Sequence, residues 1–140
     1  MTNIQHLLPS CLYFNANVFS RQLNRLADQA FKDTGISASH ASVMLMVYDN
    51  PGISPKDLSN ALSLSPSTIT RFVDALIKKK MLKRKTHGKS AFIYTTPLGL
   101  QKKKEISQAW LMLHDNYCSL LGNDSAHRLA HQISLANEKL

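Results

Sequence analysis

One stretch decides the fold of this chain: Ser65-Pro66-Ser67-Thr68-Ile69-Thr70-Arg71-Phe72-Val73-Asp74-Ala75-Leu76-Ile77. Its Ser-Pro opening is a start signal for a helix, because serine caps free backbone N–H groups and proline is tolerated at the first helical position. The apolar residues recur at the spacing of one helical face: Ile69, Phe72, Val73, Leu76 and Ile77. The residues left on the other face are polar: Ser67, Thr68, Thr70, Arg71 and Asp74. The stretch therefore predicts a helix with a buried stripe and an exposed polar flank.

A second helix of the same design precedes this one. The run Ser54-Pro55-Lys56-Asp57 repeats the start signal and adds an acid in the first turn. Its inner face is predicted to hold Leu58, Ala61 and Leu62, and the next two residues turn the chain. Further on, residues 82–84 and 92–95 are typical of strands, with residues 86–89 as the turn between them. Two short helices followed by a hairpin predict a winged helix-turn-helix.

The rest of the chain is predicted to be helical. Apolar residues at helical spacing predict helices over residues 10–32 and 37–47, separated by Asp33-Thr34-Gly35. Thr96-Pro97 opens another helix that should reach about residue 121, and Gly122 separates it from a last helix over residues 125–137. The expected fold class is mainly α, with about six helices and a wing formed by a two-stranded β-hairpin.

Length and composition set the class of protein. The 140 residues fit a single domain, and no apolar run reaches the roughly 18 residues that a membrane span needs. The N-terminus lacks a basic region followed by an apolar stretch, so we expect a cytoplasmic protein. Cys11 and Cys118 make no disulfide framework. Without a glycine-rich phosphate loop or a nucleophile motif, neither an enzyme nor a bound cofactor is expected.

The positive charge is concentrated in one segment. The net charge is +8, yet residues 78–104 hold ten basic residues and no acidic one, while the remainder has seven basic and nine acidic residues. Charge kept only for solubility would be spread over the chain, whereas a surface that binds a polyanion concentrates it. A solvated helix face next to a lysine-rich hairpin is the alternative interpretation.

The exposed flank of the helix over residues 65–77 fits the major groove of DNA. Its hydroxyl side chains are short enough for close backbone approach, and Arg71 can donate two hydrogen bonds to guanine. The basic side chains of the hairpin suit phosphates or a narrow minor groove. The residues expected at DNA are Ser54, Ser65, Ser67, Thr68, Thr70, Arg71, Lys83, Arg84, Lys89 and Ser90. Two alternatives stay open: a capped surface helix with an exposed arginine, and a winged helix that binds protein instead of DNA.

Residues 36–99 resemble the MarR family of winged helix-turn-helix regulators. The motifs that carry the resemblance are Pro51-Gly52-Ile53-Ser54-Pro55-Lys56-Asp57-Leu58-Ser59, Leu64-Ser65-Pro66-Ser67-Thr68-Ile69-Thr70-Arg71-Phe72-Val73-Asp74-Ala75-Leu76, Lys80-Met81-Leu82-Lys83-Arg84 and Tyr94-Thr95-Thr96-Pro97-Leu98-Gly99. Two features depart from the family. Glycine usually stands where this chain has Lys80-Met81, and the usual Asp-x-Arg-Ser of the wing tip is replaced by His87-Gly88-Lys89-Ser90.

The resemblance implies a transcriptional regulator that binds double-stranded DNA as a homodimer. In the family's organisation, residues 36–96 form the winged-helix lobe, and residues 1–33 and 97–140 supply the dimerisation helices. We expect a repressor whose DNA affinity is altered by a small ligand or by thiol oxidation. Apolar residues near both ends of the chain fit a dimer, although packing within one chain is the alternative: Leu7, Leu8, Leu12, Leu120, Leu121, Leu129, Ile133 and Leu135.

Sensing residues are predicted at two places, and a pair of histidines is weighed as a metal site. A branch of the family senses peroxides through a cysteine in the first helix, which makes Cys11 a candidate, with a small buried side chain as the alternative. Candidates to line a ligand pocket are Tyr13, Phe14, Asn17, Met44 and Trp110. His127 and His131 stand four residues apart on one helix, with His114 and His40 as possible additional ligands. No cysteine or carboxylate lies at ligand spacing beside the pair, so no metal site is expected.

Overall fold

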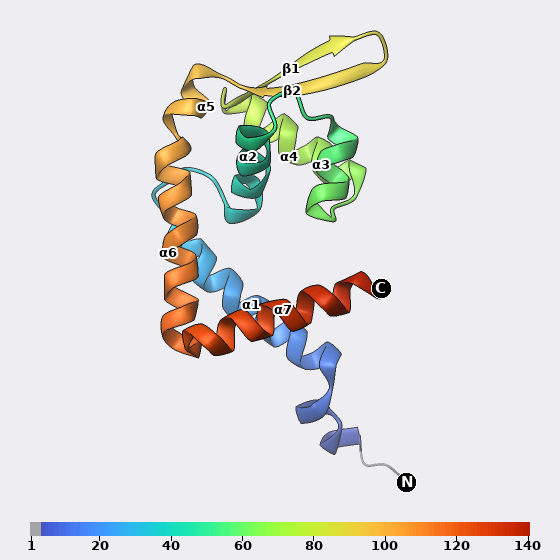
Figure 1. The fold of residues 1–140 in the computed structure, drawn as a ribbon, viewed down its shortest axis with the longest axis vertical. Coiled ribbons are helices and arrows are strands. Elements are labelled where there is room, and N and C mark those ends of the chain that lie inside the picture. The colour runs from blue at the N-terminus through green and yellow to red at the C-terminus, as the bar shows by residue number, and fades with distance from the viewer. Residues whose placement is uncertain (1–3) are drawn as a thin grey trace. The chain divides into compact units, whose positions relative to one another are not determined.

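The computed structural model describes residues 4–140, apart from the side chain of Gln5, and consists mainly of helices (Figure 1). The elements within these residues are η1 (Ile4–His6), η2 (Leu8–Ser10), α1 (Leu12–Phe31), α2 (Ala38–Asp49), α3 (Pro55–Leu62), α4 (Pro66–Lys78), β1 (Leu82–His87), β2 (Ser90–Thr95), α5 (Pro97–Gln101), α6 (Lys103–Leu121) and α7 (Asn123–Glu138). The predicted class, a mainly helical winged helix-turn-helix with a two-stranded wing, is confirmed. No helix in this part of the chain combines the length and apolar character needed to cross a bilayer.

The described residues form two compact units. The hairpin unit is Phe31–Trp110 and contains α2 to α5 and both strands. The terminal unit combines the described residues up to Ala30 with Leu111–Leu140. The predicted winged-helix lobe ends at residue 96, whereas the hairpin unit also includes α5 and the start of α6. The first three residues of the predicted segment 1–33 lie outside the described residues, and the assignment of dimerisation helices stays a prediction.

The predicted start signals act as helix caps. The hydroxyl of Ser54 accepts a hydrogen bond from the backbone N–H of Asp57 at 3.1 Å, and that of Ser65 accepts one from Thr68 at 3.2 Å. Thr96 caps α5 in the same way. Each cap satisfies a backbone donor that the first helical turn leaves without a partner. Local sequence therefore fixes where α3, α4 and α5 begin.

The core of the hairpin unit lies between the helices α2, α3 and α4 and one face of the hairpin. Helix α2 packs on β2, α4 packs on β1, and α3 packs on α4. Ile53 extends the hairpin by an isolated bridge to Ile93. The largest fully buried side chains of this core are Met44, Leu58, Ile69, Leu76, Leu82, Ile93, Val43, Val47 and Val73. Packing against this core holds α4 with its predicted apolar stripe inward and its polar flank outward.

The hairpin is longer than predicted. Its strands pair from Leu82 opposite Thr95 to His87 opposite Ser90, which leaves only Gly88 and Lys89 in the turn. Gly88 adopts a φ of +61°, a conformation that glycine reaches without steric cost. The predicted turn over residues 86–89 was therefore too wide, because lysine-rich strands give a weak strand signal.

Three further expectations need correction. Ala61 is exposed and does not belong to the inner face of α3. The single helix expected over residues 97–121 is divided at Lys102 into α5 and α6. The last helix begins at Asn123 instead of residue 125, because the positive φ of Gly122 lets the chain turn within one residue.

The backbone conformation of Lys80 explains why the family usually has glycine where this chain has Lys80-Met81. Lys80 has a φ of +62°, in the left-handed region. Its N–H donates to the carbonyl of Ile77 at 2.8 Å, and the N–H of Met81 donates to that of Leu76 at 3.0 Å. This pair of bonds is a Schellman motif, whose left-handed position is usually glycine because a Cβ there is sterically costly.

Lys80→Gly is expected to raise the free energy of unfolding by about 0.5–1 kcal/mol. Removing the Cβ relieves the left-handed conformation, and the greater freedom of glycine in the unfolded chain offsets part of the gain. Urea unfolding followed by circular dichroism measures the change. Lys78→Gly, at the last residue of α4, is the control and should instead lower stability, by less than the roughly 1 kcal/mol of a helix interior. Equal losses in both variants would contradict the strain assigned to Lys80.

Candidate nucleic-acid interface

The N-terminal turn of α4 presents a small network of hydroxyl groups. Ser65 Oγ donates to Thr68 Oγ1 at 2.9 Å and lies 3.2 Å from Ser67 Oγ. Ser65 and Ser67 are exposed, and Thr68 is half-buried. The backbone N–H groups at this end of α4 also favour a negative charge, as at other helix N-termini. The turn is therefore suited to a phosphate or to base edges.

Arg71 stands one turn further along the same exposed flank. Its Nη2 lies 3.4 Å from Thr68 Oγ1, a long hydrogen bond that steers the guanidinium toward the start of α4. An arginine near the start of a groove-binding helix can reach guanine with two parallel hydrogen bonds. The remaining N–H donors of Arg71 make no hydrogen bond within the part of the chain that the structure describes.

Two predicted contact residues use their hydroxyl groups inside the protein. Thr70 Oγ1 donates to the carbonyl of Pro66 at 3.0 Å, so its proton is engaged by its own helix. Ser54 is half-buried, and its hydroxyl caps α3. A phosphate oxygen only accepts hydrogen bonds, so Thr70 would have to break this bond before donating to one. Both residues remain candidates, with less free donor capacity than Ser67.

The two faces of the wing, the hairpin of β1 and β2, differ in character. Residues paired across the strands share a face, so Lys83 and Lys85 lie with Tyr94 and Phe92. The Nζ of Lys85 lies 5.1 Å from the centroid of the Tyr94 ring, within the range of a cation–π interaction. Lys83 and Lys85 are exposed, and Lys89 and Ser90 are exposed at the tip. This face and the tip carry the cations of the wing toward solvent.

Arg84 belongs to the opposite face, with the buried Ile93 as its cross-strand partner. Its Nη2 lies 2.8 Å from Asp74 Oδ1, so the guanidinium forms an ion pair with the recognition-helix candidate α4. The sequence placed Arg84 among the residues at DNA and Asp74 on the outer side of α4, and both side chains are exposed. The structure adds an ion pair that the local sequence does not reveal, because Arg84 links the base of the wing to α4. A role of Arg84 at DNA stays a prediction.

Other lysines of the basic segment, residues 78–104, also have partners within the hairpin unit. Lys79 donates to the carbonyl of Gly35, and Lys102 pairs with Glu105 at 3.3 Å. Lys103 lies over the ring of Tyr48 at 5.5 Å from its centroid. The charge of these lysines still contributes to the positive field of the unit, although their side chains are partly held.

The sensor and ligand-pocket candidates fall in both units. Cys11 is a free, half-buried thiol immediately before α1, and Tyr13 is exposed on α1. Phe14 and Asn17 also lie on α1, where Asn17 Nδ2 donates to the carbonyl of Tyr13 at 2.7 Å. In the hairpin unit Met44 is fully buried in the core, and Trp110 packs edge-on against Phe31. Their roles stay predictions.

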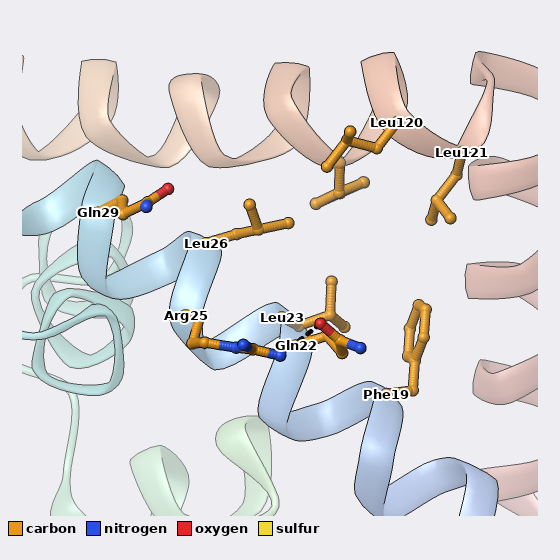
Figure 2. A pocket seen from close by; sticks show the side chains of 9 residues that line it. Phe19, Gln22, Leu23, Arg25, Leu26, Gln29, Leu120 and Leu121 are labelled. Carbon is orange, nitrogen blue, oxygen red and sulfur yellow. Dashed lines mark hydrogen bonds between the residues drawn. The ribbon is translucent and has the colours of Figure 1, made fainter.

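The terminal unit contains a pocket of about 460 Å³ that the sequence did not predict (Figure 2). None of the five predicted pocket residues lines it. Its lining residues come from α1 and α6: Phe19, Gln22, Leu23, Arg25, Leu26, Gln29, Tyr117, Leu120 and Leu121. In Figure 2 the side chains of Gln22 and Arg25 meet at one side and leucines form the opposite wall. Its volume is in the range of small-molecule sites, and mostly apolar walls with a few polar groups are typical of them.

His40, one of the residues considered as a metal ligand, lies in the hairpin unit. Its ring stacks at a tilt on Phe72, with 4.7 Å between the ring centroids. Burial and then the positive charge of Lys79 lower the pKa of the His40 imidazole. The neutral ring therefore packs against α4 as a largely apolar group at neutral pH.

Comparisons with known proteins agree with this geometry. Residues 36–90 match the model of the MarR family, whereas no curated protein matches the sequence. The fold is similar to that of PcaV from Streptomyces coelicolor in complex with its natural ligand, with a TM-score of 0.85 and 16% identity over 94% of each chain. It is similar to a mutant MarR from E. coli complexed with operator DNA, with a TM-score of 0.82, 18% identity, and 97% of this chain and 99% of that one covered. It is also similar to MepR of S. aureus in a complex with DNA, with a TM-score of 0.80, 15% identity, and 92% of this chain and 97% of that one covered.

Proposed function

We propose that this chain, whose residues 36–90 belong to the MarR family, is a transcriptional regulator that binds specific sequences of double-stranded DNA. The observation that carries the proposal is the exposed flank of α4, residues 65–71, next to a wing whose cations face solvent. The similar MarR and MepR structures are complexes with DNA, which supports the same use of this fold. The proposed regulator acts in the cytoplasm and is not an enzyme.

Recognition would divide between the two elements. Arg71 would read guanine in the major groove, with Thr68 holding its guanidinium near the start of α4. Ser65, Ser67 and the free N–H groups of that turn would bind phosphate and set the register. On the wing, Lys83, Lys89 and Ser90 would contact the neighbouring backbone or minor groove. Because Arg84 is paired with Asp74, its proposed contribution is to hold the wing in place beside α4.

A homodimer is part of the proposal. The terminal unit exposes large apolar side chains on α1 and α6, among them Leu12 at 82%, Leu111 at 61% and Leu120 at 73%. Large apolar side chains this exposed are typical of a surface that another protein covers. A second copy would cover it, and a two-fold dimer would present two α4 helices to half-sites about one DNA turn apart.

The proposed regulator is a repressor that responds to an effector. PcaV, which shares the fold, is described in complex with its natural ligand. The pocket between α1 and α6 gives this chain a candidate ligand site, and the free thiol of Cys11 gives it a candidate oxidation site. Either event would act by favouring a different separation of the two α4 helices.

A gel-shift assay tests the proposed function. Fragments of the organism's own genome would be incubated with the protein over a range of salt concentrations, and bound fragments would be sequenced. Specific, salt-dependent shifts of a small set of fragments are expected. A winged helix that binds only protein would shift no fragment at any salt concentration.

Lys89→Ala is expected to lower affinity for every duplex, whatever its sequence. A lysine at the wing tip neutralises a phosphate, so its loss should also flatten the slope of log affinity against log salt by about one unit. Anisotropy titrations at four salt concentrations measure both quantities. Lys56→Ala, which removes an exposed cation from α3, is the comparison variant. An unchanged slope in Lys89→Ala would remove the wing tip from the contact surface.

A further inference from the structure

Three potential metal ligands meet in the terminal unit, and none of them belongs to the proposed DNA surface. His114 and Cys118 lie one turn apart on α6, and His127 comes from the first half of α7. His114 Nε2 is 3.4 Å from His127 Nε2 and 3.6 Å from Cys118 Sγ. Their ligand atoms all lie within 4.8 Å of one another. The sequence paired His127 with His131, but the bend at Gly122 brings His127 to α6 instead.

Two of the three separations between these atoms match tetrahedral zinc, and the third, between Cys118 and His127, is within 4.8 Å. With Zn–N bonds of about 2.0–2.1 Å and a Zn–S bond of about 2.3 Å, tetrahedral angles separate two nitrogens by about 3.3–3.4 Å and nitrogen from sulfur by about 3.5–3.6 Å. Both measured distances, 3.4 Å and 3.6 Å, fall at these values. The side chain of His127 is exposed, so a small rotation can bring it closer to Cys118.

The surroundings prepare His114 to bind through Nε2. Its other ring nitrogen, Nδ1, lies 3.5 Å from Asp115 Oδ1. A proton on Nδ1 shared with that carboxylate leaves the lone pair of Nε2 directed at Cys118 and His127. Metal-binding histidines commonly donate their second N–H to a carboxylate, which fixes the tautomer and the ring orientation.

Burial and ligand type narrow the choice of metal. Cys118 is buried, His114 is half-buried and His127 is exposed, so an ion can enter from the side of α7. A thiolate with two imidazoles selects borderline or soft metals such as zinc, whereas magnesium and calcium prefer oxygen ligands. Three protein ligands leave the fourth tetrahedral position to water.

We propose that His114, Cys118 and His127 form a Zn²⁺ site that links α6 to α7. Binding releases the thiol proton of Cys118 to solvent, since the thiolate is the ligand. The ion would hold together two helices that are consecutive in the chain but joined only by Gly122. The site does not depend on the proposed DNA binding.

Zinc binding by the untagged full-length protein tests the site. Zn²⁺ would be titrated in competition with a chromogenic chelator, and Co²⁺ would be used in parallel for its absorption spectrum. One Zn²⁺ per chain is expected, and Co²⁺ should give tetrahedral d–d bands together with a thiolate charge-transfer band. His127→Ala should weaken Zn²⁺ binding by at least about 100-fold, because removing a ligand should cost no less than removing a supporting group. Cys118→Ser should abolish the charge-transfer band.

Matched controls lie close in the chain. His131→Ala removes a histidine one turn further along α7, and Cys11→Ser removes the other thiol; both should bind Zn²⁺ as the parent does. Asp115→Asn should weaken binding by about 10- to 100-fold through His114. Circular dichroism reports folding, and because His127 is exposed, its variant tests the site even if Cys118→Ser unfolds. Unchanged Zn²⁺ affinity in folded His127→Ala, or equal loss in His131→Ala, would overturn the proposal.

Discussion

Arg71→Ala is expected to weaken binding to a selected operator by about 1–3 kcal/mol, roughly a 5- to 150-fold rise in Kd. The variant loses a paired donor to one base, and no neighbouring side chain on the flank of α4 offers a second guanidinium. Sequence preference at that base should relax, because the remaining contacts are to phosphate. Fluorescence anisotropy on the operator and on a random duplex, at one salt concentration, gives both affinities.

Two comparison variants separate base reading from charge. Arg71→Lys keeps the positive charge but loses the planar fork, so it should lose specificity while keeping affinity for random duplex. Lys78→Ala removes a cation from the last turn of the same helix and should reduce both affinities alike. If Arg71→Ala weakens operator and random duplex equally, Arg71 contacts only phosphate, and direct reading by α4 is contradicted.

Local signals account for what the sequence predicted correctly. Each Ser-Pro or Thr-Pro start is a property of four neighbouring residues, and Ser54, Ser65 and Thr96 all cap the helices they were expected to open. The apolar stripe of α4 is equally local, since its period alone places Ile69, Val73 and Leu76 in the core. These signals are sufficient to predict the helix-turn-helix and its exposed flank.

Beyond the ends of individual elements, contacts between residues distant in the chain could not be predicted. The pattern of β1 alone does not reveal that Asp74 of α4 lies 2.8 Å from Arg84, a residue that the sequence placed at DNA. Ala61 has helical spacing from Leu58, yet α3 is too short for its far side to be covered. The period of a segment gives a face, and only the packed neighbours decide whether that face is buried.

The same limit applies to the candidate sites. The flank of α4 is one continuous stretch and could be predicted, whereas the zinc site joins α6 to α7 across the bend at Gly122. The signal that was available is the i, i+4 spacing of His114 and Cys118, which places both on one helical face. The pocket between α1 and α6 combines residues about a hundred positions apart and left no sequence signal.

Gly99→Ala is expected to lower the free energy of unfolding by about 2–4 kcal/mol, although alanine is normally the better helix former. A Cβ at Gly99 would stand 2.2 Å from the carbonyl oxygen of Met81, which is backbone and cannot swing away. That oxygen also accepts a hydrogen bond from the N–H of Thr96 at 3.1 Å. Moving Met81, which directly precedes β1, or moving α5 would disturb this junction between the wing and α5. Urea unfolding measures the loss.

A second contact makes relaxation at Gly99 costly. The Tyr48 hydroxyl donates to the carbonyl of Gly99 at 2.5 Å, and burial raises the pKa of Tyr48 to about 12, so this donor stays protonated at neutral pH. Shifting α5 away from Met81 would stretch that bond and leave a half-buried hydroxyl without its partner. Gly35→Ala is the control, because its Cβ would meet nothing within 4 Å and only its φ of +80° would be strained. A loss in Gly99→Ala no larger than in Gly35→Ala would mean that the Met81 carbonyl yields freely, and the close approach of α5 to the wing would then contribute little to stability.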